Sequence, residues 1–81
     1  MLHRKVVVRD YHGLRLRPAA RIARACRDID SKVTISKGKE VADATSILEI
    51  LLLDAGLGSS LDIRAEGIEE ELAIRRIVGL F

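Results

Sequence analysis

The residues best suited to chemistry in this sequence gather between positions 11 and 20, around a predicted helix start. Pro18 fits the first turn of a helix, because an N–H is not needed there and the φ of proline is already fixed. The first-turn amides have no partner inside the helix, and the peptide dipoles add partial positive charge beside them. Arg15 and Arg17 place two permanent cations at the same point. This combination predicts an anion site for phosphate or carboxylate, with a solvated basic loop as the alternative.

Hydrophobic periodicity predicts the elements that would position these residues. The predicted order is strand 5–9, helix 17–28, strands 32–37 and 40–42, a helix from Ser46 to about Gly56, strand 61–65 and a helix over about 68–78. This β-α-β-β-α-β-α order predicts an α+β two-layer open-faced sandwich, a four-stranded, largely antiparallel sheet with three helices on one face. No linker or repeat interrupts it, so we expect one domain over residues 1–81.

The second predicted helix carries more apolar side chains than one buried face needs. Six of the seven residues from 47 to 53 are aliphatic, whereas a surface helix of a two-layer domain buries about one face. If Ile50 and Leu53 point at the sheet, the other aliphatic side chains lie outward or at the margin: Ile47, Leu48, Leu51 and Leu52. A contiguous exposed patch marks an interaction surface, so residues 47–52 predict a protein partner or a homo-oligomer. The alternative is a helix that is sunk deeper than usual or covered by the loop around Leu14.

Composition argues against several classes of function. A formal net charge of only +2 and two aromatic residues do not suit a nucleic-acid-binding surface. Cys26 is the single cysteine, so neither a disulfide nor a cysteine-based metal site is expected, and helical spacing places it on a buried face. No apolar run reaches the ~20 residues that span a bilayer, and the first residues lead into a strand rather than a signal peptide. We therefore expect a cytoplasmic protein without a membrane segment, metal or cofactor.

Two motifs resemble those of HPr, the small phosphocarrier protein of the bacterial phosphoenolpyruvate:sugar phosphotransferase system. The first runs from Gly13 to Ala19 and reads Gly-Leu-Arg-Leu-Arg-Pro-Ala, and the second is Ser46-Ile47 at a later helix start. Length, element order and motif placement match over nearly the whole chain. The resemblance implies a phosphocarrier rather than an enzyme, acting in sugar transport or its regulation with enzyme I and enzyme IIA as partners.

The sequence departs from the family pattern at the position that carries the phosphoryl group. In the family this position is a histidine, and here it is Arg15. A guanidinium stays protonated at physiological pH and offers no lone pair for attack on phosphorus. Arg17, which the resemblance implies would stabilise a phosphorylated histidine, is retained. We therefore predict a non-phosphorylatable variant that acts in regulation or protein binding.

Two other interpretations stay open. His12 lies three residues before Arg15 and is a candidate substitute phosphoacceptor, whereas His3 lies upstream of the first predicted strand and has no such argument. Alternatively, the chain is a small anion-binding module in which His12, Arg15 and Arg17 hold phosphate or sulfate without covalent chemistry.

Ser46 is a candidate regulatory site. The resemblance implies that a dedicated kinase phosphorylates the matching serine in Gram-positive relatives. However, Ser46 and Glu49 have the Ser-x-x-Glu spacing of a capping box, and a carboxylate there would compete with a phosphate for the same amides. The sequence therefore favours a plain helix N-cap at Ser46.

The first two helices together predict a docking surface. Arginines on the outer side of the first helix would supply charge, and the second helix would supply apolar contact. A partner with an acidic rim fits this combination, whether enzyme I, enzyme IIA or a regulatory protein. The predicted docking residues are Leu14, Arg17, Arg21, Arg24, Ile47, Leu48, Leu51 and Leu52.

Overall fold

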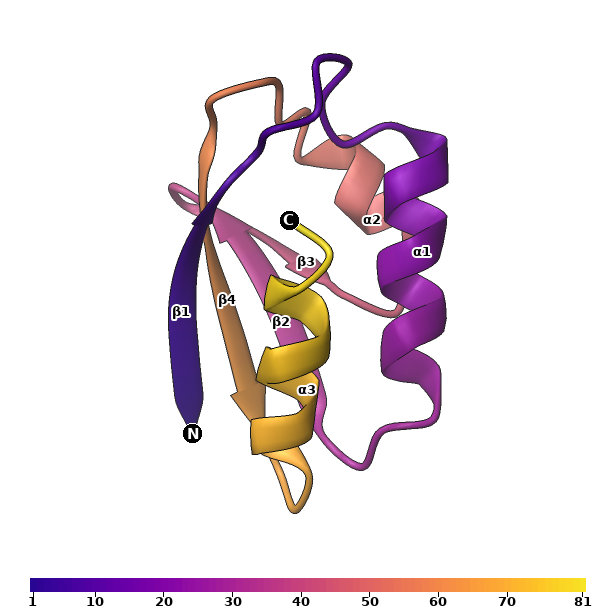
Figure 1. Ribbon diagram of the computed structural model, residues 1–81, viewed down its shortest axis with the longest axis vertical. Coiled ribbons are helices and arrows are strands. Elements are labelled where there is room, and N and C mark those ends of the chain that lie inside the picture. The colour runs from indigo at the N-terminus through magenta and orange to yellow at the C-terminus, as the bar shows by residue number, and fades with distance from the viewer.

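Four strands form one antiparallel sheet in the computed structural model, which describes residues 1–81 (Figure 1). The strands are β1 Leu2–Val7, β2 Lys32–Lys37, β3 Glu40–Asp43 and β4 Ser60–Glu66. Their order across the sheet is β1-β4-β2-β3. The helices are α1 Leu16–Arg27, α2 Ile47–Leu52 and α3 Glu70–Val78. The predicted β-α-β-β-α-β-α order and the predicted α+β sandwich are confirmed.

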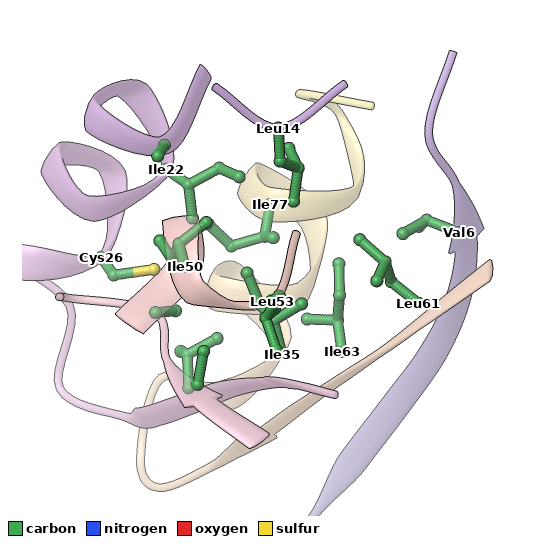
Figure 2. Packing of buried hydrophobic residues seen from close by; sticks show 14 of the residues in the cluster. Val6, Leu14, Ile22, Cys26, Ile35, Ile50, Leu53, Leu61, Ile63 and Ile77 are labelled. Atoms are coloured by element: carbon green, nitrogen blue, oxygen red, sulfur yellow. The ribbon is translucent and has the colours of Figure 1, made fainter. Parts of the chain in front are cut away.

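All three helices cover the same face of the sheet (Figure 1). Alternation along the strands sends one set of side chains toward the helices, and Ile35 and Ile63 are completely buried there. Figure 2 shows how these strand residues meet Ile22 from α1, Ile50 from α2 and Ile77 from α3. The other face of the sheet is open, and the strands direct polar side chains toward it: Thr34, Ser36, Asp62 and Arg64.

The first strand begins earlier than predicted and also ends earlier, at Val7. It pairs with β4 from Leu2 opposite Ala65 to Val7 opposite Ser60. The predicted bounds of 5–9 are wrong, because the ladder of hydrogen bonds with β4 decides where the strand lies and the β-branched run does not.

The second helix is shorter than predicted and ends at Leu52 rather than near Gly56. Asp54 has a φ of 51°, a left-handed conformation that cannot continue a right-handed helix. Lys37 Nζ donates to the carbonyl oxygens of Leu53 and Asp54 at 3.1 and 3.0 Å. A side chain from β2 therefore satisfies carbonyls at this helix end, and local sequence could not reveal that contact.

The third helix begins at Glu70 rather than at Ile68, which is 87% exposed. Gly67 has a φ of 148°, and a Cβ at this position would lie 2.8 Å from the Cα of Ser31. Glu69 then donates its N–H to the carbonyl of Asp30 at 2.9 Å, which fixes the helix start against the α1–β2 connection. No helix of the structure combines the length and the apolar content needed to cross a membrane.

Candidate functional site

The loop that leads into α1 is shaped by its own backbone. Asp10 Oδ1 accepts the N–H of His12 at 2.9 Å, and the carbonyl of Asp10 accepts the N–H of Gly13, also at 2.9 Å. Together these bonds form a tight turn in which the aspartate side chain supports the backbone two residues on. The ring of Tyr11 packs edge-on against the ring of His12, with centroids 5.2 Å apart.

Gly13 and Leu14 anchor this loop on the segment that follows α2. Gly13 has a φ of +75°, and a Cβ on it would lie 2.6 Å from the carbonyl oxygen of Ala55. That same carbonyl accepts the N–H of Leu14 at 2.8 Å. Leu14 is only 7% exposed, so it is part of the core, although we predict it from sequence as a docking residue. The reason is that the close backbone approach at Gly13 pulls its neighbour inward.

Arg15 is the N-cap residue of α1, and its side chain makes no capping bond. Instead its Nε donates to the carbonyl oxygen of His12 at 3.0 Å. The guanidinium is therefore held at the backbone of His12, and both residues line a hollow of about 670 Å³. Leu16 and Leu51 form apolar parts of its wall. Neither ring nitrogen of His12 makes a hydrogen bond within the protein.

Asp54 lines the same hollow, and sequence reasoning missed it. Its carboxylate adds a negative charge beside His12 and Arg15, two of the residues that we predict from sequence to bind an anion. The only signal in the sequence is an acidic residue in an Asp-Ala-Gly stretch just after an aliphatic run, where a chain reversal is common.

Arg17 does not line the hollow that contains Arg15, but it lines two others. A hollow of about 190 Å³ is lined by Arg17 together with Arg9 and Arg21, and a hollow of about 510 Å³ is lined by Arg17 together with Arg21 and Arg24. The predicted anion-binding residues are thus divided: His12 and Arg15 share a hollow, and Arg17 belongs to the cluster on α1.

The outer sides of α1 and α2 form one surface, because the two helices pack against each other (Figure 1). We call it the leucine–arginine surface and define it by six exposed residues: Leu16, Arg17, Arg21, Arg24, Leu48 and Leu52. The three leucines are 63, 66 and 67% exposed, and Ile50 and Leu53 are buried as predicted. Ile47 and Leu51 are only partly buried and pack against the core. Leu16 is missing from the predicted docking residues, because its spacing of three residues before Ala19 and seven before Ala23 places it beside the buried face of α1.

Ser46 is the N-cap of α2, as predicted, and its Oγ accepts the N–H of Glu49 at 3.2 Å. The predicted capping box is only half formed, because the carboxylate of Glu49 does not return to Ser46. Instead Glu49 Oε1 accepts the N–H of Asp43 at 3.0 Å, and the N–H of Ser46 donates to the carbonyl of Asp43. Two hydrogen bonds from Thr45 to Asp43 lower the pKa of that carboxyl. Ser46 therefore lies in an ordered turn with two carboxylates nearby.

Cys26 is 2% exposed in the core, as its helical position predicts. Burial, together with the charge of Asp43, raises the pKa of its thiol to about 11, and the charge of Arg76 opposes this shift. The thiol therefore stays protonated at neutral pH and acts as a small apolar side chain. No group of three or more histidine, cysteine, aspartate or glutamate side chains is placed to hold a metal ion.

Comparison with known proteins agrees with this architecture. A family model described as the PTS HPr component phosphorylation site matches residues 2–81. The chain belongs to the HPr family. It is 35% identical to the phosphocarrier protein NPr of Proteus mirabilis over 80 residues, which cover 98% of this chain and 89% of that one. The resemblance inferred from the two motifs is thereby confirmed.

Solved structures of the family superpose closely on this fold. HPr of Thermoanaerobacter tengcongensis matches with a TM-score of 0.94 at 30% identity, covering 99% of this chain and 90% of that one. The catabolite repression protein Crh of Bacillus subtilis, a domain-swapped dimer, matches with a TM-score of 0.79 at 29% identity, covering 99% and 92%. The family consists of phosphocarriers of the phosphotransferase system rather than enzymes, and its members interact with enzyme I and enzyme IIA.

Proposed function

We propose that this HPr-family chain is a protein-binding or regulatory member that carries no phosphoryl group on residue 15. The observation that carries the proposal is the position of Arg15. Its guanidinium is held at the start of α1 by a hydrogen bond from Nε to the His12 carbonyl at 3.0 Å. A phosphoryl acceptor needs a lone pair, and a guanidinium has none at physiological pH. At this helix start Arg15 can therefore bind an anion, but it cannot accept a phosphoryl group as a histidine does.

The leucine–arginine surface supports binding to another protein. None of its arginines has an acidic partner within 4.0 Å, and its leucines are largely exposed. An acidic rim on the partner would pair with the arginines and speed encounter, while apolar contact with the leucines would supply affinity. Enzyme I and enzyme IIA are candidate partners because the family interacts with them. A regulatory protein is the other candidate, since Crh is named for catabolite repression.

A phosphotransfer assay tests the proposal. The wild-type chain and the Arg15→His variant would each be incubated with enzyme I and phosphoenolpyruvate. The intact mass of each protein would then be measured by mass spectrometry under non-acidic conditions. We expect no phosphoryl adduct on the wild type and one adduct on Arg15→His, because the variant restores a nucleophilic nitrogen at the helix start. A wild-type adduct that His12→Ala abolishes would overturn the proposal.

The second candidate function is a phosphocarrier that uses His12. It is favoured by one observation: the unbonded imidazole of His12 and the guanidinium of Arg15 line the same hollow. A nitrogen of His12 would attack phosphorus as the donor's histidine nitrogen leaves, with Arg15 stabilising the transferred oxygens. The same assay decides between the two functions, because this one requires an acid-labile adduct on His12 and transfer onward to enzyme IIA.

A further inference from the structure

A second, smaller hollow beside the start of α1 is lined by three arginines. Its volume is about 190 Å³, and it shares only Leu14 with the hollow that contains Arg15. Arg9 comes from the segment after β1, while Arg17 and Arg21 lie one turn apart on α1. Three guanidinium-bearing residues from two parts of the chain therefore surround one small space.

These arginines form no ion pair within the protein. No carboxylate oxygen lies within 4.0 Å of a nitrogen of Arg9, Arg17 or Arg21, and none of their side chains makes a hydrogen bond. Arg17 and Arg21 also repel each other, as like charges do at this helical spacing. Asp10 is the one acidic side chain in the lining, and its Oδ1 already accepts the N–H of His12. An anion entering the hollow would relieve this repulsion.

The rest of the hollow is apolar. Val8 and Leu14 form part of its lining and are 2 and 7% exposed, and Pro18, Leu80 and Phe81 complete it. The volume equals that of roughly six water molecules, which is more than a bare phosphate ion needs. A ligand that fills the space therefore has a charged head and a short carbon chain.

Charge selects the head group. The lining carries three guanidiniums and one acidic side chain, an excess of positive charge that suits an anion, and a phosphate monoester carries a charge of about −1.5 to −2 at pH 7. Guanidinium groups also bind phosphate oxygens through paired N–H donors. We propose that this hollow binds a small phosphate monoester without covalent chemistry, its phosphate held by Arg9, Arg17 and Arg21 and its carbon chain against Leu14 and Pro18. The site shares Arg17 and Arg21 with the leucine–arginine surface, whereas Arg9 and the apolar lining lie outside that surface.

Titration followed by NMR tests the site. Glycerol 3-phosphate would be added to the labelled full chain, with glycerate as a carboxylate of similar size and inorganic phosphate as the bare head group. We expect saturable shifts of the Arg9 and Leu80 amides at millimolar or lower ester, with weaker binding of the other two anions. Arg9→Gln and Arg21→Gln should each weaken ester binding about tenfold.

Arg24→Gln is the matched control, because Arg24 is an exposed arginine of the same helix that lies outside the hollow. It should leave ester binding unchanged. Equal weakening in all three variants would show diffuse attraction by the helix, and no saturable shift with millimolar ester would show that there is no site. Either result overturns the proposal. Arg9→Gln also separates it from the docking proposal, because Arg9 lies outside the leucine–arginine surface and its loss should not change binding to enzyme I.

Discussion

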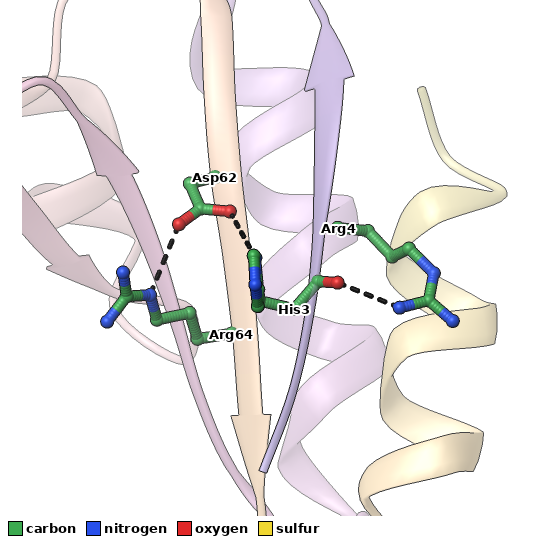
Figure 3. A network of polar contacts seen from close by, with 4 residues as sticks. All are labelled: His3, Arg4, Asp62 and Arg64. Atoms are coloured by element: carbon green, nitrogen blue, oxygen red, sulfur yellow. Dashed lines mark hydrogen bonds and ion pairs between the residues drawn. The ribbon is translucent and has the colours of Figure 1, made fainter.

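The open face of the sheet and the leucine–arginine surface treat their charges in opposite ways. On the sheet, Asp62 lies between His3 and Arg64 and contacts His3 Nδ1 at 3.2 Å and Arg64 Nε at 3.1 Å (Figure 3). On the helices, the surface arginines have no acidic partner within 4.0 Å. One face pairs charges within the chain, and the other leaves them for solvent or for another molecule.

Apolar exposure follows the same division. The sheet face exposes Val7 on β1 and Val41 on β3, which are the two edge strands and are therefore separated by the width of the sheet. The leucine–arginine surface instead gathers three exposed leucines on two helices in contact. Scattered exposed apolar residues are normal, whereas a cluster beside unpaired charge has the composition of an interface. The comparison therefore supports the proposal that the helical face binds the partner.

The largest expected effect comes from Gly13→Ala, because Gly13 packs the loop that leads into α1 against the segment that follows α2. A Cβ would clash with the Ala55 carbonyl at 2.6 Å while the backbone stays at a φ of +75°. We expect a loss of about 2–4 kcal/mol in the free energy of unfolding, measured by urea denaturation.

Two glycine controls separate the causes of that loss. Gly38→Ala has a φ of +60° but nothing within 4 Å of the new Cβ, so it should cost about 1 kcal/mol from backbone strain alone. Gly56→Ala has open space and no positive φ, so it should change the free energy by less than about 0.5 kcal/mol. Equal losses for Gly13 and Gly38 would show that the contact with Ala55 does not matter.

Truncating the exposed leucines should separate binding from stability. Leu48→Ala and Leu52→Ala remove side chains that are 66 and 67% exposed, so the free energy of unfolding should change by less than about 0.5 kcal/mol. We expect the affinity for enzyme I, measured by calorimetry, to fall about tenfold for each. Ile68→Ala is the control, since Ile68 is 87% exposed but lies before α3 and outside the surface. A similar loss of affinity in that variant would contradict the assignment.

Neutralising one arginine on each face gives a smaller effect. Arg24→Gln should lower the association rate with enzyme I about two- to threefold at low salt, and the difference should vanish at high salt. Arg64→Gln should leave that rate unchanged and cost less than about 1 kcal/mol of stability, because its ion pair is half-exposed. Stopped-flow measurements over a range of salt concentrations would check both. Equal rate losses would mean that only net charge matters.

The fold was largely predictable because its signals are local. Alternating strands, an amphipathic α1 and the Ser46 N-cap all come from short-range spacing, and the structure contains each of them. The element ends were not predictable, because β1 is set by its ladder with β4 and α2 ends where Lys37 reaches its carbonyls. Those contacts join residues far apart in the sequence.

The candidate site was predictable in residue type and less so in arrangement. Arg15 and Arg17 belong to the motif and His12 directly precedes it, and spacing placed the exposed leucines on α2. The separation of Arg15 from Arg17, the burial of Leu14 and the presence of Asp54 depend on how the loop packs against Ala55 and Gly56. Such a backbone-to-backbone contact leaves only a glycine as its trace in the sequence.

The smallest expected effect is Asp62→Asn, which removes the charge pairing of the sheet face. Partial burial raises the pKa of Asp62, but hydrogen bonds from Arg64 and His3 and their charges outweigh it and leave the pKa below 3.8. A carboxyl group whose pKa is lower in the folded protein than in the unfolded chain stabilises the fold at pH values above its unfolded-state pKa. This stabilisation is lost as the pH falls through the folded-state pKa. Wild type should therefore exceed Asp62→Asn by a few tenths of a kcal/mol near neutral pH, and the difference should disappear as pH falls below 3.8. Thermal denaturation of both proteins as a function of pH measures this difference. A difference that stays constant into acid would show that the carboxylate charge is not what holds His3 and Arg64, and the contrast between the two faces would then not rest on charge pairing.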